Sequence, residues 1–381
     1  MTETTRTTQC TAAEPVLYLG FELGSTKWVL AFTTAVAQRA RLRTIPAGNV
    51  AALEGEILTA KARFGLAIDA PVHTCYEAGR DGFWLHRWLS ARGIANLVVD
   101  SSSIEVNRRA RRAKTDRLDA AKLVHLLLRY ARGERKVWSV VHVPTRDAEA
   151  ARQVPREIAT VREDRTRVRN RLLALLATQG IRCRLTRHFP TQLATLQTAD
   201  GHPLATAFRE RLAREWVQLV AIGARLRQLR AAQAEAIAQG TDRVAVVART
   251  LCRLSGVAEK SAGLYSAELF ATRTFSNGRQ VGALVGLAPV PYRSDQRVQD
   301  QGISKAGRAE LRRVSIQLAW YWLRYQPDSA LSQWFKRRFA SAGGRSRRIG
   351  IVAVARKLVI ALWRFVAQGV IPEGARLKSV A

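Results

Sequence analysis

Residues 16–32 read Val-Leu-Tyr-Leu-Gly-Phe-Glu-Leu-Gly-Ser-Thr-Lys-Trp-Val-Leu-Ala-Phe, and this stretch decides how the first part of the chain folds. Two apolar runs rich in strand-forming residues flank a Gly-Ser turn, which predicts a β-hairpin. Similar patterns predict strands over residues 65–69, 72–77 and 95–100 and helices over residues 81–92 and 115–130. Strands that alternate with helices indicate an α/β domain, which we place at residues 14–145.

The composition changes in the middle of the chain. Residues 146–180 and 204–240 are dense in Arg, Leu and Ala with few Gly or Pro, which predicts two long helices. The connection around residues 189–203 contains Pro and Gly, so we expect a helical hairpin or coiled coil within residues 146–244. The sequence of residues 245–375 predicts a mainly helical region with Gly-bearing turns.

The charge of the chain is strongly one-sided. Its 381 residues include 62 Lys and Arg but 30 Asp and Glu, so the formal net charge is +32 at pH 7. Hydrophobic residues make up 47% of the chain, which is enough for folded domains and excludes a disordered basic tail. A surplus of this size repels itself unless a polyanion neutralises it, and nucleic acid is the expected partner.

The sequence does not point to a membrane or to an oxidising compartment. The most apolar stretch, residues 349–371, is interrupted by Arg356, Lys357 and Arg364 on one side of a predicted amphipathic helix, so we expect no membrane span. The four cysteines are scattered without a C-x-x-C pair, which argues against a zinc ribbon or a disulfide framework. Because the N-terminus shows no signal pattern, the expected location is the cytoplasm.

Four carboxylates are candidates for chemistry, namely Glu22, Glu77, Asp116 and Asp119. Glu22 interrupts an apolar strand, where an acidic side chain is costly unless it is paired or bound to a metal, and Glu77 ends another strand. Asp116 and Asp119 are three residues apart, so they share one face of a predicted helix. Carboxylates that converge from separate elements can hold Mg²⁺ and support phosphodiester chemistry.

A basic run precedes the two aspartates and would draw a phosphate backbone toward them. Its candidate nucleic-acid-binding residues are Arg108, Arg109, Arg111, Arg112 and Lys114. The alternative interpretation of the run is a solvated basic segment. The alternative for Asp116 and Asp119 is that they simply form ion pairs with Arg112 and Lys122.

The last region offers two serines and a second basic group. Ser294 and Ser304 each lie in a Gly-bearing segment, and the residues alone do not decide which one is a nucleophile. The basic residues that could hold phosphate oxygens nearby are Lys305, Arg308, Arg312 and Arg313. Residues 254–260, Leu-Ser-Gly-Val-Ala-Glu-Lys, have the pattern of a helix–turn–helix hairpin of the kind that contacts phosphate backbones.

Four segments occur together in a characteristic order. They are Cys-Tyr-Glu77-Ala-Gly, Lys-Thr-Asp116-Arg-Leu-Asp119-Ala-Ala-Lys, Gly-Leu-Ala-Pro-Val-Pro-Tyr-Arg-Ser294 and Gly-Ile-Ser304-Lys-Ala-Gly-Arg-Ala-Glu-Leu-Arg-Arg. With these segments the chain resembles the transposases of the IS110/IS1111 family from about residue 16 to residue 372. It departs from the family pattern at Glu22, where an aspartate is usual, and at Asp295, where a glycine is usual.

The resemblance implies an α/β plus α architecture. The first domain, residues 14–145, would be RuvC-like (RNase H-type). A helical coiled-coil linker would occupy residues 146–244, and a mainly helical C-terminal transposase domain would occupy residues 245–375.

The resemblance also implies a chemistry and a set of partners. The metal ligands for Mg²⁺ would be Glu22, Glu77, Asp116 and Asp119, and Ser294 would be the nucleophile that forms a phosphoserine intermediate. The expected function is site-specific DNA recombination in the transposition of an insertion sequence. The implied partners are donor and target DNA, a structured non-coding bridge RNA, and further copies of the chain in dimers and tetramers, in the bacterial cytoplasm at the nucleoid.

Two other functions compete with this interpretation. Glu22 and Asp295, at the two departures, fit a catalytically weakened homologue that still binds nucleic acid. Residues 20–26, Gly-Phe-Glu-Leu-Gly-Ser-Thr, resemble the first phosphate loop of sugar kinases and actin-like ATPases. A second phosphate loop and an adenosine-binding glycine pair do not follow in the sequence, and a kinase has no use for the basic surplus.

Overall fold

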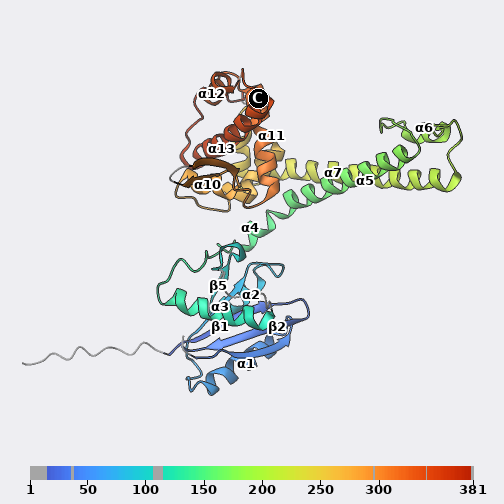
Figure 1. Cartoon of the computed structure of the whole chain (residues 1–381). Helices are drawn as coiled ribbons and strands as arrows, with labels where there is room; N and C mark the ends of the chain where they lie inside the picture. Colours follow the sequence, from blue (N-terminus) through green and yellow to red (C-terminus); the bar gives the residue numbers. More distant parts are fainter. Residues whose placement is uncertain (1–14, 36–37, 106–114, 295–296, 340, 379–381) are drawn as a thin grey trace, which may run out of the picture. The chain divides into compact units, whose positions relative to one another are not determined.

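A computed structural model of the chain describes residues 15–35, 38–105, 115–294, 297–339 and 341–378. For residues 292–294 and 297–301 it describes the backbone alone. The basic run with Arg108, Arg109, Arg111, Arg112 and Lys114 lies outside the described residues, as does Asp295. The chain divides into two compact units, Met1–Val143 and Pro144–Ala381, whose elements are labelled in Figure 1.

Unit 1 contains a five-stranded mixed sheet. Its strands are β1 (Leu17–Leu23), β2 (Lys27–Thr33), β3 (Arg41–Pro46), β4 (Val72–Glu77) and β5 (Ala95–Val99), in the order β3-β2-β1-β4-β5. β1 pairs antiparallel with β2, and β2 with β3, whereas β4 runs parallel to both β1 and β5. The hairpin predicted over residues 16–32 is confirmed as β1 and β2, and the strands predicted over 72–77 and 95–100 are confirmed as β4 and β5.

The two faces of the sheet pack against different helices. These helices are α1 (Val50–Arg63), α2 (Trp84–Ser90) and α3 (Asp116–Ala131), and the short turn η1 (Ser101–Ser103) follows β5. Leu17, Leu19 and Phe21 of β1 pack in one core with Leu53 of α1 and Leu85 of α2. The alternate residues of β1, β2 and β4 lie on the opposite face, against which α3 packs. Burial on both faces explains why these strands are nearly continuous apolar runs.

The strand predicted over residues 65–69 is wrong. α1 ends at Arg63, and Gly65 turns the chain with φ +64°. Lys61 then donates from Nζ to the carbonyl oxygen of Ile68 at 2.6 Å, and the Ile68 side chain is 82% exposed. The segment is apolar enough to imitate a strand, but it forms the turn that closes α1 and joins no sheet.

Unit 2 begins with a long helical hairpin. Its helices are α4 (Arg146–Ala150), α5 (Gln153–Thr178), α6 (Phe189–Thr195) and α7 (Thr206–Gln239). Ile158 of α5 packs with Leu226 of α7, and Leu172 packs with Leu212, so the two long helices lie side by side and antiparallel (Figure 1). The two long helices predicted from the composition are therefore confirmed.

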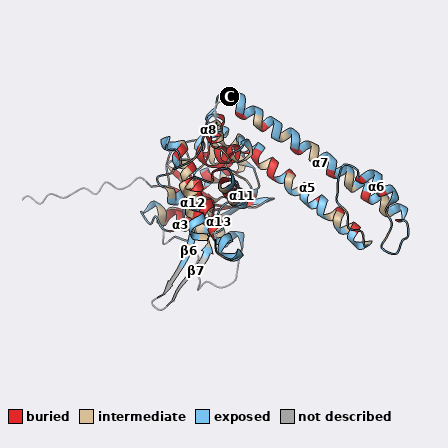
Figure 2. Ribbon diagram, turned by 90° about the horizontal axis from the view of Figure 1, so that it is seen from above, coloured by how far each residue is buried: buried red, intermediate tan, exposed pale blue. Residues whose placement is uncertain are grey.

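The contact between α5 and α7 has the geometry of a coiled coil. Leu212, Leu219, Leu226 and Gln233 of α7 are buried and recur every seven residues, which is the spacing of a coiled-coil seam. The remaining surface of both helices is largely exposed (Figure 2).

The rest of unit 2 is mainly helical, as predicted. Its elements are α8 (Arg243–Cys252), α9 (Glu259–Tyr265), the π-helical turn η2 (Ser266–Phe270), α10 (Gly278–Leu284), β6 (Pro289–Ser294), β7 (Arg297–Ile303), α11 (Ala309–Tyr325), α12 (Ala330–Phe339) and α13 (Gly344–Gln368). The residues predicted to face the core from α13 are buried there: Ala355, Leu358, Val359, Leu362 and Phe365. The hairpin of β6 and β7 was not predicted. No helix within the described part of the chain combines the length and apolarity needed to cross a bilayer.

Candidate catalytic centre

Glu22 and Glu77 lie side by side at one end of the sheet of unit 1. β1 and β4 are parallel, and their register pairs Phe21 with Tyr76, so the next residues of the two strands are the two glutamates. Phe21 and Tyr76 are buried in the core with α1 and α2. Because successive strand residues point to opposite faces, both glutamates lie on the face that packs against α3. Both are half-buried.

Gly20 allows α3 to lie directly on β1. A Cβ atom at this position would come within 2.7 Å of the backbone N of Val124 and 2.9 Å of the carbonyl oxygen of Ala120. Any residue other than glycine would therefore collide with the helix backbone. The helix is thereby held two residues along the strand from Glu22, on the same face.

The first turn of α3 lies at the same end of the sheet as the two glutamates. Thr115 caps the helix by accepting a hydrogen bond from the backbone N of Leu118. Asp116 in that turn has its Oδ2 atom 4.0 Å from Nζ of Lys27, the first residue of β2 after the β1–β2 turn. Asp119 is half-buried and Asp116 is exposed. The four predicted acidic residues thus share one face and one end of the sheet.

The described acidic groups do not form a closed ligand shell as they stand. No three His, Cys, Asp or Glu side chains of the described ranges are close enough together to hold a metal ion. The ion pair seen for Asp116 is with Lys27 of the neighbouring strand and not with Lys122 of its own helix. Both side chains of that pair are more than half exposed, so the pair contributes little to stability and leaves Asp116 accessible.

The two candidate serines of unit 2 lie at opposite ends of one β-hairpin. Ser294 is the last residue of β6, and its backbone pairs with Arg297, the first residue of β7. Ser304 follows β7 at the other end, where Pro289 pairs with Ile303. At about 3.3 Å per residue, the two serines are on the order of 15 Å apart along the hairpin. They cannot serve the same phosphate.

Ser304 belongs to a tightly packed loop. Its backbone N donates to the carbonyl oxygen of Ala288 at 2.8 Å. Gly286 and Gly307 both adopt a positive φ, and a Cβ at Gly286 would come within 2.2 Å of the carbonyl oxygen of Ala306. The two glycine-bearing segments singled out in the sequence therefore meet at the base of the hairpin. Their glycines are required by backbone-to-backbone contact.

The three arginines predicted to hold phosphate have partners within unit 2. Arg308 forms an ion pair with Glu268, and Arg313 binds both carboxylate oxygens of Glu310 at 2.9 and 2.8 Å. Arg312 donates from Nη1 to the carbonyl oxygen of Lys305 at 2.9 Å, and so braces the loop that contains Ser304. Lys305, the fourth residue of this group, is exposed.

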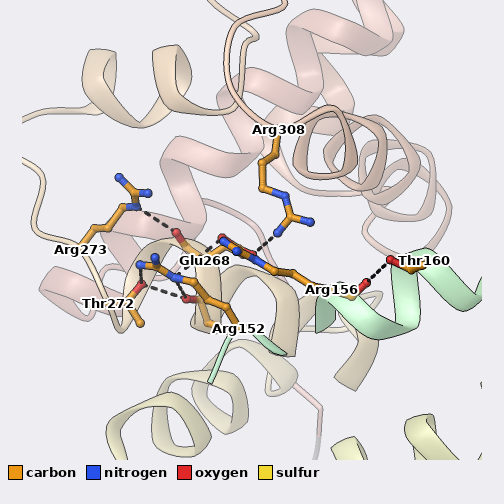
Figure 3. A network of polar contacts seen from close by, with 8 residues as sticks. Arg152, Arg156, Thr160, Glu268, Thr272, Arg273 and Arg308 are labelled. Carbon is orange, nitrogen blue, oxygen red and sulfur yellow. Dashed lines mark hydrogen bonds and ion pairs between the residues drawn. The ribbon is translucent and has the colours of Figure 1, made fainter. Parts of the chain in front are cut away.

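Glu268, which was not among the residues predicted from the sequence, is the centre of a buried network (Figure 3). Its side chain is 3% exposed and accepts hydrogen bonds from Arg156 Nε at 2.8 Å and Arg156 Nη2 at 3.2 Å. Arg308 adds a second ion pair, and Arg152 Nε lies 3.9 Å away. Arg273 donates from Nε to the backbone carbonyl of Glu268 at 3.2 Å. Arg156 belongs to α5 and Arg152 immediately precedes that helix, so the network ties the start of the long hairpin to the core of unit 2.

The arginines keep this buried carboxylate ionised. Burial alone would raise the pKa of Glu268. The hydrogen bond from Arg156 and the charges of Arg308, Arg156 and Arg152 outweigh burial, and the pKa lies below its ordinary value. Glu310 behaves in the same way: burial acts to raise its pKa, but the bonds from Arg162 and Arg313 lower it to about 2.

The signal for Glu268 was present in the sequence. A single acidic residue stands in the apolar run Leu264-Tyr-Ser-Ala-Glu-Leu-Phe270. An isolated charge in such a run is either paired or functional. Which arginines would reach it could not be read from the sequence, because they lie in segments about 40 and 112 residues away.

Comparison with known proteins shows to which family the chain is related. Residues 248–333, from α8 to α12 with the β6–β7 hairpin between them, match the family model described as "Transposase IS116/IS110/IS902 family". The chain is 38% identical over 380 residues, 95% of each protein, to "Putative transposase y4rJ" of Sinorhizobium fredii. It is 26% identical to "Putative transposase y4qE" of the same organism over 322 residues, 77% of this chain and 74% of that protein.

A shorter match agrees with these. The chain is 31% identical to "Transposase for insertion sequence element IS1533" of Leptospira borgpetersenii over 111 residues, which are 29% of this chain and 30% of that protein. Relatives of this kind mark a DNA-processing enzyme. Because the match to the first relative spans nearly the whole of both proteins and agrees with the family model, the chain belongs to the IS116/IS110/IS902 family of transposases.

Proposed function

We propose that this transposase cuts and rejoins DNA strands through a phosphoserine formed at Ser294, with the help of a divalent cation held by Glu22, Glu77, Asp116 and Asp119. The observation that carries the proposal is the position of the four acidic residues on one face and at one end of the sheet. The mixed sheet, with three antiparallel strands followed by two parallel ones and α3 over the acidic face, supports a RuvC-like (RNase H-type) first domain.

The donor chemistry of the acidic residues fits Mg²⁺, which prefers carboxylate oxygens and water. No three of the described groups are close enough yet, so binding would have to draw Asp116 away from Lys27 and toward the glutamates. The exposed Asp116–Lys27 pair is weak enough to allow this. A cation held there would neutralise charge on the scissile phosphate.

Ser294 would supply the covalent step. Its Oγ would attack the phosphorus of a DNA phosphodiester, forming the Ser–O–P bond while the P–O bond to one deoxyribose breaks. The serine proton would finish on the departing deoxyribose hydroxyl. Attack by a hydroxyl of another strand would reverse these changes and release the serine. The bond energy would be conserved, so rejoining would need no nucleotide cofactor.

The partners in this proposal are donor and target DNA, a structured bridge RNA, and further copies of the chain in a dimer or tetramer. The net charge of +32 supports polyanionic partners. The acidic group and Ser294 lie in different units, so each unit on its own would hold half of the machinery.

A cleavage assay tests the proposal directly. Full-length protein is mixed with Mg²⁺, the RNA that co-purifies with it, and end-labelled DNA carrying the ends of the insertion sequence. We expect nicked DNA and a labelled protein–DNA adduct on denaturing gels. Ser294→Ala should abolish the adduct, whereas Ser304→Ala should retain it. An adduct that persists in Ser294→Ala refutes the assignment of the nucleophile.

The acidic group is tested by substitutions that remove charge and keep size. Glu77→Gln and Asp116→Asn should each abolish nicking, while the matched change Asp69→Asn, in an exposed loop, should have no effect. If wild-type protein binds DNA but shows no metal-dependent nicking, the catalytically weakened homologue is correct instead. ATP turnover would favour the kinase-like alternative.

Sharing of sites between subunits has its own test. Ser294→Ala protein mixed with Asp116→Asn protein regains cleavage if one subunit supplies the serine and another the acidic group. If mixed oligomers never regain cleavage, each subunit completes its own site.

A further inference from the structure

The helix–turn–helix at residues 243–265 holds a pocket that the proposed strand cleavage does not use. Its helices, α8 and α9, are joined by residues 253–258, as the sequence pattern of this segment predicted. A cavity of about 410 Å³ lies between this turn and α11. Val257 and Leu318, which are 1% and 2% exposed, form its apolar floor. The size suits a single nucleoside.

Two aromatic rings form one wall of this pocket. Tyr321 and Tyr325 are one helical turn apart on α11, and their side chains are 44% and 50% exposed. The ring centroids lie 6.4 Å apart with an angle of 39° between the planes. Exposed tyrosine faces beside an apolar floor are the surfaces on which unstacked nucleobases pack.

The rim of the pocket is basic. Lys260 and Lys378 line it, and none of its described lining residues is acidic. Burial lowers the pKa of Lys260, and the nearby charges of Arg230, Arg162 and Arg313 lower it further, whereas Glu310 acts to raise it. The surplus of positive over negative groups around Lys260 favours an anionic group beside the rings.

Close packing and hydrogen bonds hold the turn beside the pocket against α11. Gly256 has φ +84°, and a Cβ there would come within 3.1 Å of the Cβ of Tyr325, so the turn packs closely on α11. Gln326, which is 1% exposed, donates from Nε2 to the carbonyl oxygen of Ser255 at 2.9 Å. Lys378 donates from Nζ to the carbonyl oxygen of Val257 at 2.9 Å. A preformed site loses less conformational entropy when it binds.

We infer that this pocket receives one unpaired nucleotide of a nucleic-acid strand, its base stacked against Tyr321 and Tyr325 and its phosphate beside Lys260. A fully paired duplex does not fit this site, because its bases are stacked and must leave the helix to enter a pocket. The inference concerns strand binding and does not depend on whether the protein cleaves DNA.

Binding measurements on the full-length protein test the inference. The probes are a fluorescein-labelled oligo-dT strand and a fully paired duplex of equal length, with binding followed by fluorescence anisotropy. Loss of one stacking ring weakens strand binding about tenfold. Tyr321→Leu should therefore raise the Kd for the strand by about this factor and leave the Kd for the duplex within about twofold. Tyr321→Phe, which keeps the ring, should bind the strand as wild type does.

Photocrosslinking of wild-type protein gives an independent measurement if Tyr321→Leu fails to fold. An oligo-dT strand carrying 5-iodouracil should form an adduct with Tyr321 or Tyr325, located by mass spectrometry. An adduct that maps only outside the pocket overturns the inference. So does equal strand binding by wild type and the leucine variant, or a leucine variant that loses self-association instead of strand affinity, which would make this face a contact between copies.

Discussion

Removing the charge of Glu268 should destabilise unit 2 without touching the proposed catalytic residues. Glu268→Gln keeps the volume of the side chain but leaves three arginines without their shared carboxylate. Breaking a buried ion pair by removing one partner costs about 3–5 kcal/mol. The side chains of Arg156 and Arg308 are 42% and 35% exposed and can turn toward water, whereas Arg152 is 5% exposed and cannot. We therefore expect the lower end, about 3 kcal/mol.

For a unit of this size, 1 kcal/mol corresponds to about 2–4 °C in Tm, so Glu268→Gln should melt about 6–12 °C below wild type in calorimetry. Glu157→Gln is the matched control, because Glu157 pairs with Arg225 on the surface and its loss should cost less than about 1 kcal/mol. If the two variants melt together, the network does not hold unit 2.

The stability difference between wild type and Glu268→Gln should depend on pH. The pKa of Glu268 is lowered in the folded protein, so its contribution is fully present above the ordinary carboxyl pKa and is lost as pH falls through the lowered value. The gap in Tm between wild type and Glu268→Gln should be full at neutral pH and shrink below about pH 4. A gap that widens in acid contradicts this account.

Three further predictions follow from other contacts. Gly20→Ala should destabilise unit 1 by about 1–3 kcal/mol and abolish nicking, because the added Cβ collides with the backbone of α3. Gly55→Ala, where a Cβ meets no atom within 4 Å, is the control and should change neither property. Thermal melts and the nicking assay measure both variants. Glu310→Gln should remove the part of the acid sensitivity of unit 2 that lies between pH 4.5 and about pH 2, because the folded pKa is lowered across that window, and urea midpoints at a series of pH values measure this. Arg345 and Arg348 line a groove between α13 and the β6–β7 hairpin. Replacing both with Gln should reduce the slope of log K for DNA binding against log salt concentration by about two. An unchanged slope would show that neither residue contacts phosphate.

Most of the correctly predicted strands of unit 1 were predicted from their apolar runs. The stretch from residue 16 to 32 predicted its hairpin because both strands are buried on both faces and a turn separates them. β3, with the sequence Arg-Leu-Arg-Thr-Ile-Pro, was missed because Ile45 alone is buried in this edge strand, so the strand carries little apolar signal. The strand prediction over residues 65–69 was wrong for the opposite reason. Ala67 and Ile68 are apolar but exposed, and nothing in the local sequence distinguishes such a turn from a strand.

The candidate site was predictable to the extent that its elements could be placed. Glu22 and Glu77 end neighbouring parallel strands, and strand alternation gives them a common face. That Asp116 and Asp119 come to the same end depends on the contact of α3 with Gly20, which joins residues about 100 positions apart. The partner of Arg308 was beyond reach for the same reason, since Glu268 lies 40 residues away in another helical element. Arg313, by contrast, pairs with Glu310 three residues earlier in the same helix, a spacing that the sequence contains.

The arginines of unit 2 divide according to what they contact, and this division separates those already paired with a buried carboxylate from those free to meet a phosphate. Arg156 and Arg308 share Glu268, so their charges mainly offset a carboxylate that burial would otherwise destabilise. Arg345 and Arg348 instead line a groove of about 810 Å³ between the base of the β6–β7 hairpin and α13, and none of the described residues lining that groove is acidic. A phosphate at the first pair would have to displace Glu268, whereas a phosphate at the second would meet uncompensated charge. The groove lies at the base of the hairpin, on the order of 15 Å along β6 from Ser294, so a DNA backbone held there would have to follow the strand to reach the proposed nucleophile.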